Sequence, residues 1–388
     1  MKPKKNVKNN ILPHSQAKLD LYKTYLDKYF TVLGLAKGIT RINLYDIFCG
    51  TGIYEDGNIG SPIVAFNCIK ANRDFFIKNN WPRKPITLTV NDGNKESIEK
   101  VRTYLEEQNN TICNIDYHNL EAGEMFKFVQ NQLSTKSSQE RNLVFIDPYG
   151  YKNIRKESLY NILQNNTTEI ILFLPTSQMY RFSNYALEDM DKPFEPLRNF
   201  IFEFFEESHP MRNDQVDSIF SYIQYLKKAF SFNDKFYTSS HYLQRDNSNY
   251  FAIFYITSNI YGLDRMLSAK WQQDPVKGQG TRLRTGQTFL FDDQFKQEDK
   301  NLTLEWLEEI MINYLRSKER VTNIDLYEFV LKNDFRATFA VTILKEWTKA
   351  SFVTVFDYAS DEKFKPNAYY LNYENYKSLI PKVYFKLK

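Results

Sequence analysis

Hydrophobic positions in the first half of the chain follow two alternating periods. Residues 16–33 carry apolar and aromatic side chains at helical spacing, which predicts a helix that packs one face on the body of the protein. Short β-prone runs then alternate with helical patterns. We expect strands at 42–48, 86–92, 112–117, 143–147 and 169–174, with helices around 61–78, 94–108, 120–133 and 155–165. This order predicts a parallel sheet covered by helices on both faces.

The pattern changes after the fifth predicted strand. Residues 177–231 are typical of helices rich in Phe and Tyr, and they form an insertion before the next strand. Two adjacent β-prone runs, 236–244 and 250–257, are separated by the polar segment RDNSN and predict a hairpin. The sheet would therefore end in a sixth strand and an antiparallel seventh.

The C-terminal part has a different composition and a different pattern of apolar residues. Residues 274–297 form a glycine-rich stretch with a basic cluster at Lys277, Arg282 and Arg284. Three short helical patterns follow, and then FVTVFDY, a charged tip and NAYYLNY, which predict a hairpin and hence a winged helix-turn-helix. The predicted domains are a basic segment and helix at 1–35, an α/β domain at 36–273, a linker at 274–300 and a winged unit at 301–388.

Composition narrows the class of protein. Hydrophobic residues at 42% and charged residues at 25% are ordinary for a soluble globular chain, and no apolar run reaches the length of a membrane span. We therefore expect a cytoplasmic protein. Cys49, Cys68 and Cys113 are widely spaced and the 4 His are scattered, so we expect no metal site or disulfide framework. A net charge of +4 is too small to establish nucleic-acid binding.

The segment INLYDIFCGTG, residues 42–52, is the strongest indication of chemistry. A strand that ends in Asp46-x-Phe48-x-Gly50-x-Gly52 is how many methyltransferases open their pocket for S-adenosylmethionine, because glycines let the backbone turn sharply beside a ligand. Asp46 would accept hydrogen bonds from the cofactor's amino group. The alternative is that Asp46 only caps an ordinary turn. With the strand order above, the fold class is α/β, a Rossmann-like class I methyltransferase sheet.

Two residues after later strands complete the predicted cofactor site. Asp92 ends the second strand, where Rossmann-type sites place an acid on the ribose hydroxyls. Asn119, just past the third strand, would hold the adenine edge, and the alternative is that it is the N-cap of the next helix.

The fourth strand ends in FIDPYG, opposite the glycine turn. Amino-group methyltransferases hold their target here with Asp or Asn, a Pro-Pro pair and an aromatic that stacks on a flipped-out base. Asp147, Pro148 and Tyr149 supply an acid, a rigid turn and an aromatic, but the second proline is missing and the aromatic is displaced by one position. The alternative is a turn with an incidental acid.

Other polar residues are weaker candidates. His14 and Lys18 lie one helical turn apart and could face one pocket. The insertion contains Arg181, Arg198 and Arg212, which could contact phosphate groups or could simply be solvated. The winged unit could dock onto DNA or protein through five cations, although Glu346, Asp361 and Glu362 interrupt this surface. These cations are Arg336, Lys345, Lys349, Lys363 and Lys365.

Together these motifs resemble the bacterial three-Cys-motif partner proteins (TcmP). The resemblance spans roughly residues 14–295 and rests on HSQAKLDLYKTYL, YDIFCGTGIYEDGNIGSP, FIDPYGY and YFAIFYITSNIYGLDRML. It implies a class I methyltransferase that uses S-adenosylmethionine, and a protein partner that carries a three-cysteine motif. Our first hypothesis is a methyltransferase acting on DNA or RNA, at adenine N6. The alternative is a non-catalytic partner or regulator that keeps the fold.

Overall fold

The computed structural model describes most of the chain, and its parts form two compact units. The described residues are 11–108, 111–188, 192–213, 215–246, 249–275, 278–281, 304–365 and 367–388. The first unit extends to Gly262 and includes a short segment at Gly280, and the second comprises Leu263–Gln279 and the C-terminal residues. The sequence analysis placed residues 263–273 in the α/β domain, whereas their contacts group them with the C-terminal unit.

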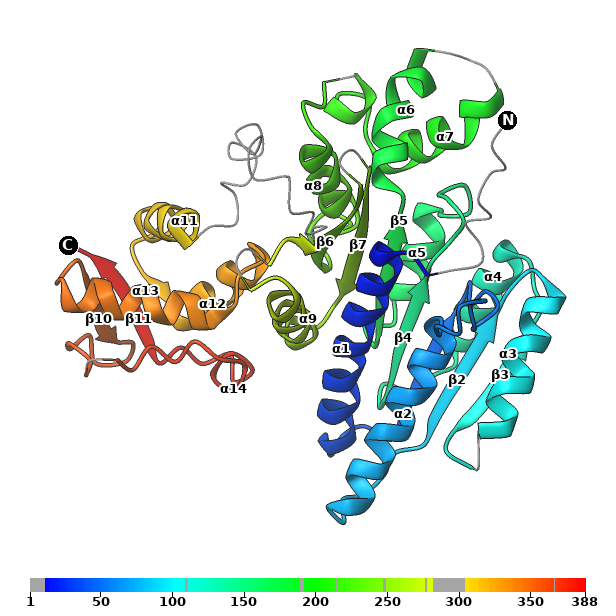
Figure 1. Cartoon of the computed structure of the whole chain (residues 1–388). Coiled ribbons are helices and arrows are strands. Elements are labelled where there is room, and N and C mark those ends of the chain that lie inside the picture. Colours follow the sequence, from blue (N-terminus) through cyan, green and yellow to red (C-terminus); the bar gives the residue numbers. More distant parts are fainter. Residues whose placement is uncertain are drawn as a thin grey trace. The chain divides into compact units, whose positions relative to one another are not determined.

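The first unit is built on an eight-stranded sheet in the order β3-β2-β1-β4-β5-β7-β6-β8 (Figure 1). Strands β1 to β5 are parallel, and β7 pairs antiparallel with both β5 and β6. The predicted α/β class, with parallel strands and an antiparallel seventh strand, is therefore confirmed. The strands are β1 Arg41–Asp46, β2 Ile86–Asn91, β3 Asn114–His118, β4 Glu140–Ile146, β5 Thr168–Leu174, β6 Tyr237–Asp246, β7 Asn249–Thr257 and β8 Gly280–Thr281.

Helices connect these strands and cover the sheet. Among them, α1, α2 and α3 pack side by side in chain order, α4 packs on α5, and Figure 1 shows α1 and α2 lying across the front of the sheet. All seven residues of β5 are buried, as expected for a strand covered on both faces. These helices are α1 Pro13–Leu35, α2 Ser61–Lys78, α3 Lys95–Gln108, α4 Ala122–Ser134 and α5 Lys156–Leu163.

The predicted helical insertion between the fifth and sixth strands is present. It contains α6 Thr176–Glu188, α7 Glu195–Phe204 and α8 Ile219–Ala229, with 3-10 turns at Lys192–Phe194 and Pro210–Arg212. The short strand β8, which pairs parallel with β6, was not predicted. Of the basic cluster, Lys277, Arg282 and Arg284 lie outside the described residues.

A buried polar contact fixes α1 against the sheet. Tyr25 on α1 donates a hydrogen bond to Glu169 on β5, and its hydroxyl lies 2.7 Å from that of Tyr255 on β7. Burial raises the pKa of Glu169, and the hydrogen bonds from its neighbours oppose this rise. The N-terminal turns of α1 lie at the carboxyl ends of β4 and β5, where Lys18 contacts Asp147 and the Phe173 ring.

The second unit combines helices with a small antiparallel sheet, ordered β10-β11-β9. Its elements are α9 Ile260–Gln273 (from Leu263), α11 Leu304–Arg316, β9 Val321–Thr322, α12 Asn323–Lys332, α13 Ala337–Lys349, β10 Val353–Asp357, α14 Tyr373–Tyr376 and β11 Val383–Leu387. The predicted second hairpin strand, NAYYLNY at 367–373, is wrong, since β10 pairs with β11 instead. Tyr369 of that segment is buried, and its hydroxyl donates to the carbonyl of Leu344 on α13 at 3.1 Å.

Length and hydropathy together distinguish the helices of the described residues from a membrane span. Within the described residues, none combines the length and the apolar character that crossing a bilayer requires.

Candidate active site

The turn after β1 has the backbone geometry that its glycines suggested. Gly50 and Gly52 adopt φ values of +60° and +71°, in the left-handed region that glycine tolerates best. A Cβ at Gly52 would lie 2.8 Å from Val101 Cγ2, whereas a Cβ at Gly50 would meet nothing within 4 Å. Gly52 therefore allows close packing, and Gly50 leaves open space where a ligand could approach the backbone.

Asp92 at the end of β2 holds this turn in place. Its Oδ2 accepts a hydrogen bond from the Gly50 N–H at 3.0 Å, and its Oδ1 accepts one from the Asn94 N–H at 2.9 Å. The Cys49 N–H also donates to the carbonyl of Asn91, at 2.9 Å. The two predicted cofactor residues Gly50 and Asp92 are thus brought into direct contact.

Asn119 does not act as the N-cap that the sequence left open, because α4 begins after Glu121. Its side-chain amide instead donates to the Asp92 carbonyl at 2.8 Å. Asn119 is exposed and does not line the cavity described below, so its contact with the Asp92 backbone lies outside that cavity.

Asp46 is fully buried beneath the turn and does not line the cavity. Neither of its oxygens has a partner with hydrogen-bond geometry among the described residues, so Asp46 does not form the turn cap that was the alternative to a role in cofactor binding. Burial raises the pKa of Asp46 to about 7, and the nearby Asp147 adds to this rise. The Ser61 hydroxyl, the Lys18 ammonium and the Phe48 N–H lie close enough to oppose it.

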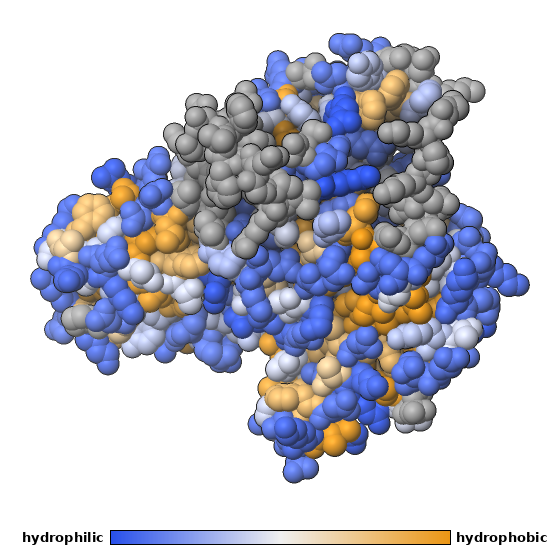
Figure 2. All heavy atoms as spheres, viewed as in Figure 1, coloured by the Kyte–Doolittle hydropathy of each residue, from blue (hydrophilic) through white to orange (hydrophobic). Residues whose placement is uncertain are grey.

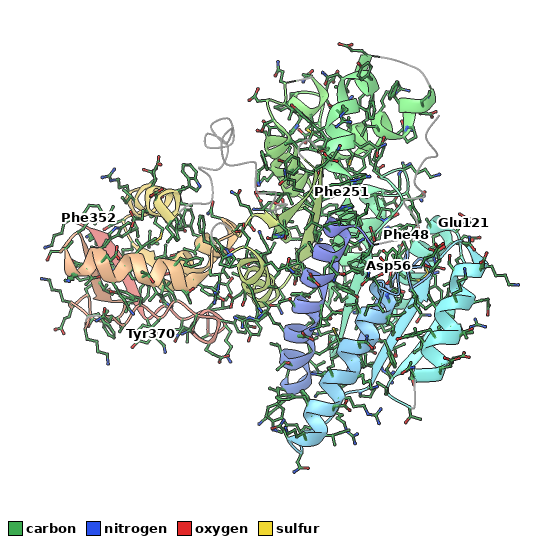
Figure 3. All side chains as sticks on the ribbon, viewed as in Figure 1. Phe48, Asp56, Glu121, Phe251, Phe352 and Tyr370 are labelled. Atoms are coloured by element: carbon green, nitrogen blue, oxygen red, sulfur yellow. The ribbon has the colours of Figure 1, made fainter. Side chains whose placement is uncertain are left out.

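A cavity of about 880 Å³ opens at the carboxyl ends of these strands. It is lined by the glycine turn, Asp92, residues 147–152, the start of α1 and aromatic residues of β5 and β7. In Figure 3 the labelled Phe48 and Phe251 lie at this end of the unit, with Asp56 and Glu121 close by. Phe48 lines the cavity and meets the Phe126 ring of α4 edge-on, with 6.5 Å between centroids. Ligands of open α/β sheets bind at this edge.

The DPYG segment after β4 lies on the same cavity. Pro148 is buried, Tyr149 is 86% exposed, and the Asp147 side chain is 23% exposed. Asp147 forms an ion pair through Oδ2 with the Lys18 ammonium of α1. The cavity therefore brings Asp147, Pro148 and Tyr149 together with Phe48, Gly50, Gly52 and Asp92, and leaves Asp46 and Asn119 outside its lining.

His14 and Lys18 belong to the site more firmly than the sequence analysis indicated. Both are buried, at 7% and 6% exposure, and both line the cavity. The His14 ring stacks on Phe251 at 4.6 Å, and Phe251 stacks on Phe173 at 5.1 Å. Burial, with the nearby Arg245 and Lys18 charges, lowers the pKa of His14 to about 4, so the ring is neutral at pH 7. Their four-residue spacing on a helix was the available signal.

The arginines of the insertion do not line this cavity. Arg198 is buried, Arg181 donates to Asn249 at 3.0 Å, and the Arg212 guanidinium lies 4.0 Å from the centre of the Phe202 ring. The sequence analysis offered phosphate binding or solvation for these arginines. The structure instead shows them buried or in contact with other residues of the protein.

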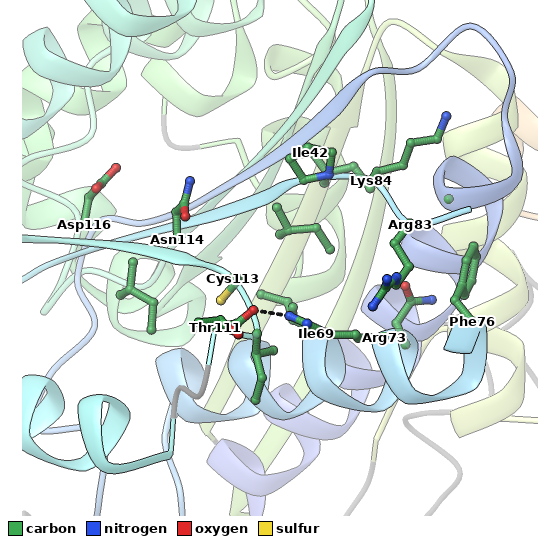
Figure 4. A pocket seen from close by; sticks show the side chains of 16 residues that line it. Ile42, Ile69, Arg73, Phe76, Arg83, Lys84, Thr111, Cys113, Asn114 and Asp116 are labelled. Carbon is green, nitrogen blue, oxygen red and sulfur yellow. Dashed lines mark hydrogen bonds between the residues drawn. The ribbon is translucent and has the colours of Figure 1, made fainter. Parts of the chain in front are cut away.

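A second cavity, of about 890 Å³, lies at the amino ends of β1, β2 and β3 (Figure 4). Its lining includes Arg73, which donates to the Thr111 carbonyl, and Lys84, which donates to the Ala36 carbonyl at 3.0 Å. Burial raises the pKa of Cys113 there to about 12, so its thiol is not a ready nucleophile. We therefore assign the chemistry to the cavity at the carboxyl ends.

Comparisons with known proteins give weak likenesses. No family model matches the sequence and no curated protein matches it, so the resemblance to TcmP is not supported. WbdD, a bifunctional kinase-methyltransferase, is 10% identical with a TM-score of 0.33, and the match covers 66% of this chain but 45% of WbdD. A magnesium protoporphyrin IX methyltransferase from Synechocystis PCC 6803, solved with SAH, is 5% identical over 64% of this chain and 89% of its own, with a TM-score of 0.32.

An O-methyltransferase from Bacillus cereus, also in complex with SAH, is 9% identical over 64% of this chain and 83% of its own, with a TM-score of 0.32. Scores this low carry no argument about the site. The case for function therefore rests on the strand order and on the residues themselves.

Proposed function

We propose that this chain is a methyltransferase that uses S-adenosylmethionine. The observation that carries the proposal is the turn after β1, where Gly50 and Gly52 are left-handed and Asp92 accepts the Gly50 N–H. This turn opens on a cavity of about 880 Å³, at the edge where parallel sheets bind ligands. The residues fit the cofactor, because open space lies over Gly50 and a fixed carboxylate stands beside it.

Each side chain then has a defined task. The glycine turn would admit the methionine half of the cofactor, and Asp92 would face the ribose hydroxyls. When bound, S-adenosylmethionine supplies a methyl group whose bond to sulfur breaks as the bond to the target nitrogen forms, and that nitrogen releases a proton to water. Asp147 would accept a hydrogen bond from the target amine, and Pro148 would keep this acceptor rigid. Holding the amine in line supplies much of the rate effect.

We further propose a base in nucleic acid as the target, with adenine N6 as the first candidate. The DPY segment supports this, because such segments pair an acceptor with an aromatic face for a flipped-out base. The order of helices and strands in the second unit supports a winged helix that docks on DNA or RNA. A protein partner with a three-cysteine motif is part of the proposal through the motif resemblance alone. A cytoplasmic location is part of it through the composition of the sequence.

One observation favours a second candidate, a non-catalytic regulator that keeps the cofactor as a ligand. Asp147 is already paired with Lys18, and Tyr149 is 86% exposed rather than packed beside the acceptor. Stable co-purification with the product of a neighbouring gene, without any methylated product, would identify this function.

The deciding experiment is calorimetric titration of the protein with S-adenosylmethionine and S-adenosylhomocysteine. We expect Asp92→Asn to weaken binding at least tenfold, because it replaces the acceptor of the Gly50 N–H with an amide. Asp116→Asn is the matched control, since Asp116 is an exposed acid of β3 outside this cavity. Absence of binding by folded wild type, or equal binding by Asp92→Asn, would refute the proposed cofactor site.

A further inference from the structure

The ion pair between Lys18 and Asp147 joins two elements 129 residues apart in the sequence. We infer that Lys18 is a positioning residue that holds Asp147 so that its second oxygen accepts a hydrogen bond from a neutral, planar amine. The inference rests on the proposed methyltransferase function and specifies the substrate class of the same site.

The contacts leave one carboxylate oxygen of Asp147 available. Lys18 Nζ contacts Oδ2, and no residue in the described part of the chain donates a hydrogen bond to Oδ1. The Asp147 side chain is 23% exposed and lines the cavity, whereas the Lys18 side chain is only 7% exposed. The pair therefore has a buried end that fixes its geometry and an accessible end that faces the ligand.

Lys18 is itself held by an aromatic stack. Its ammonium lies 4.5 Å from the centre of the Phe173 ring, which stacks on Phe251, which in turn stacks on His14. A lysine has many rotamers, and the cation–π contact restricts them. His14 and Lys18 lie one turn apart on α1, so the same helix contributes the first and the last residue of the series His14, Phe251, Phe173 and Lys18.

The charges of the cavity disfavour a cationic target such as a lysine side chain. Lys18 neutralises Asp147, and the remaining charged residues of the lining are Asp92, on the cofactor side, and the exposed cations Lys152 and Arg245. Among the residues that line the cavity on the Asp147 side, an alkylammonium would meet no acid without a paired cation. An exocyclic amine of a base is uncharged, donates N–H groups and needs only the acceptor.

The test compares nucleosides with analogues that lack the amine, using protein saturated with S-adenosylhomocysteine and NMR titration as readout. The probes are adenosine against purine riboside, and cytidine against its 4-deamino analogue, so that the two arms separate the two bases. We expect wild type to prefer one amine over its analogue by about tenfold, the usual effect of one hydrogen bond to a charged acceptor.

The variants separate positioning from general structure. We expect Lys18→Met to lose the preference, because Asp147 is no longer oriented, and Lys18→Arg to retain most of it. Lys23→Met is the matched control, since Lys23 is an exposed residue of the same helix that pairs with Asp27. Affinity for S-adenosylhomocysteine should stay unchanged in all three variants, because Lys18 acts on the target side.

Several results would overturn the inference. These are no preference by wild type, no measurable binding of either nucleoside, an unchanged preference in Lys18→Met, or tighter binding of Nα-acetyl-lysine methylamide than of the nucleosides. Failure of the cofactor to bind wild type would refute the proposed function instead, so the two failures are distinguishable.

Discussion

At the scale of single residues, the site depends on charges that are removed from water. Asp46 is fully buried, and Lys18 is nearly so beside Asp147. Taking a carboxylate out of water favours its neutral form, unless a partner compensates. Lys18 compensates Asp147 directly and Asp46 only at longer range, so Asp46 keeps a raised pKa.

Asp46 therefore gives a prediction about pH. Burial raises its pKa from 3.8 to about 7, so the folded state binds the proton more tightly than the unfolded state does. The stability contributed by this proton is present below about pH 4 and is lost as the pH rises through about 7. We expect Asp46→Asn to gain stability relative to wild type over this range, by at most about 4 kcal/mol.

The measurement is urea unfolding of both proteins at several pH values. Asp74→Asn, which changes an exposed acid of α2, serves as the control and should show no such trend. A stability difference between Asp46→Asn and wild type that stays constant with pH would contradict the raised pKa.

At the scale of elements, local patterns in the sequence predicted most of the α/β unit. The strand and helix alternation through β5, the insertion and the β6–β7 hairpin all follow from the spacing of apolar residues. The second strand of the C-terminal hairpin was wrong, because 367–373 is rich in Tyr and Asn but packs on α13, while β11 forms at the end of the chain. Such pairing depends on tertiary contacts that propensity does not contain.

The sequence predicted those parts of the site that lie within one short motif or at the ends of successive strands. It did not predict the contact between distant segments. Gly50 and Gly52 stand in one short motif, and Asp92 follows the next strand, so their meeting at one sheet edge follows from the parallel topology. The pairing of Lys18 with Asp147 requires knowledge of how α1 crosses the sheet. Its register is fixed by the contacts of Tyr25 with Glu169 and Tyr255, which no spacing in the sequence encodes.

Helix α9 provides a prediction at this scale. Lys270 on α9 is 1% exposed at its side chain and pairs at 3.0 Å with Asp334, whose carbonyl also accepts from the Trp271 indole N–H at 3.0 Å. We expect Lys270→Met to destabilise the second unit by about 3 kcal/mol, because it leaves a buried carboxylate without this cation. Calorimetric unfolding of the full chain measures the effect.

The double variant Lys270→Met, Asp334→Asn is the control. Asp334 has a φ of +67°, which Asn also tolerates, so this change removes the charge without new backbone strain. We expect it to recover part of the lost stability. A single variant as stable as the double variant would show that the ion pair contributes little.

At the scale of the whole molecule, the candidate cavity and a set of exposed cations belong to different units. The first unit holds all the residues that line the candidate site. Figure 2 shows apolar side chains at the far end of α2, where Phe75, Ile77 and Trp81 are exposed, on the side away from the glycine turn. In the second unit, Lys345 and Lys349 of α13 are exposed, as is Lys363 after β10.

This division predicts how nucleic acid binding should respond to charge. We expect the double variant Lys345→Gln, Lys349→Gln to bind a labelled oligonucleotide about tenfold more weakly than wild type. The slope of log affinity against log salt concentration should also become shallower, by about one for each phosphate that the variant no longer neutralises. Fluorescence anisotropy over a series of salt concentrations measures both quantities in the full chain.

The control removes the same charge from the first unit, through Lys23→Gln and Lys100→Gln on the exposed faces of α1 and α3. If the control weakens binding as much as the α13 variant does, only net charge matters and the second unit has no special role. If neither changes affinity or slope, nucleic acid does not bind through α13, and docking onto a protein becomes the function to test for that unit. A loss confined to the α13 variant would place the recognition of nucleic acid in the second unit, separate from the residues that would orient the amine.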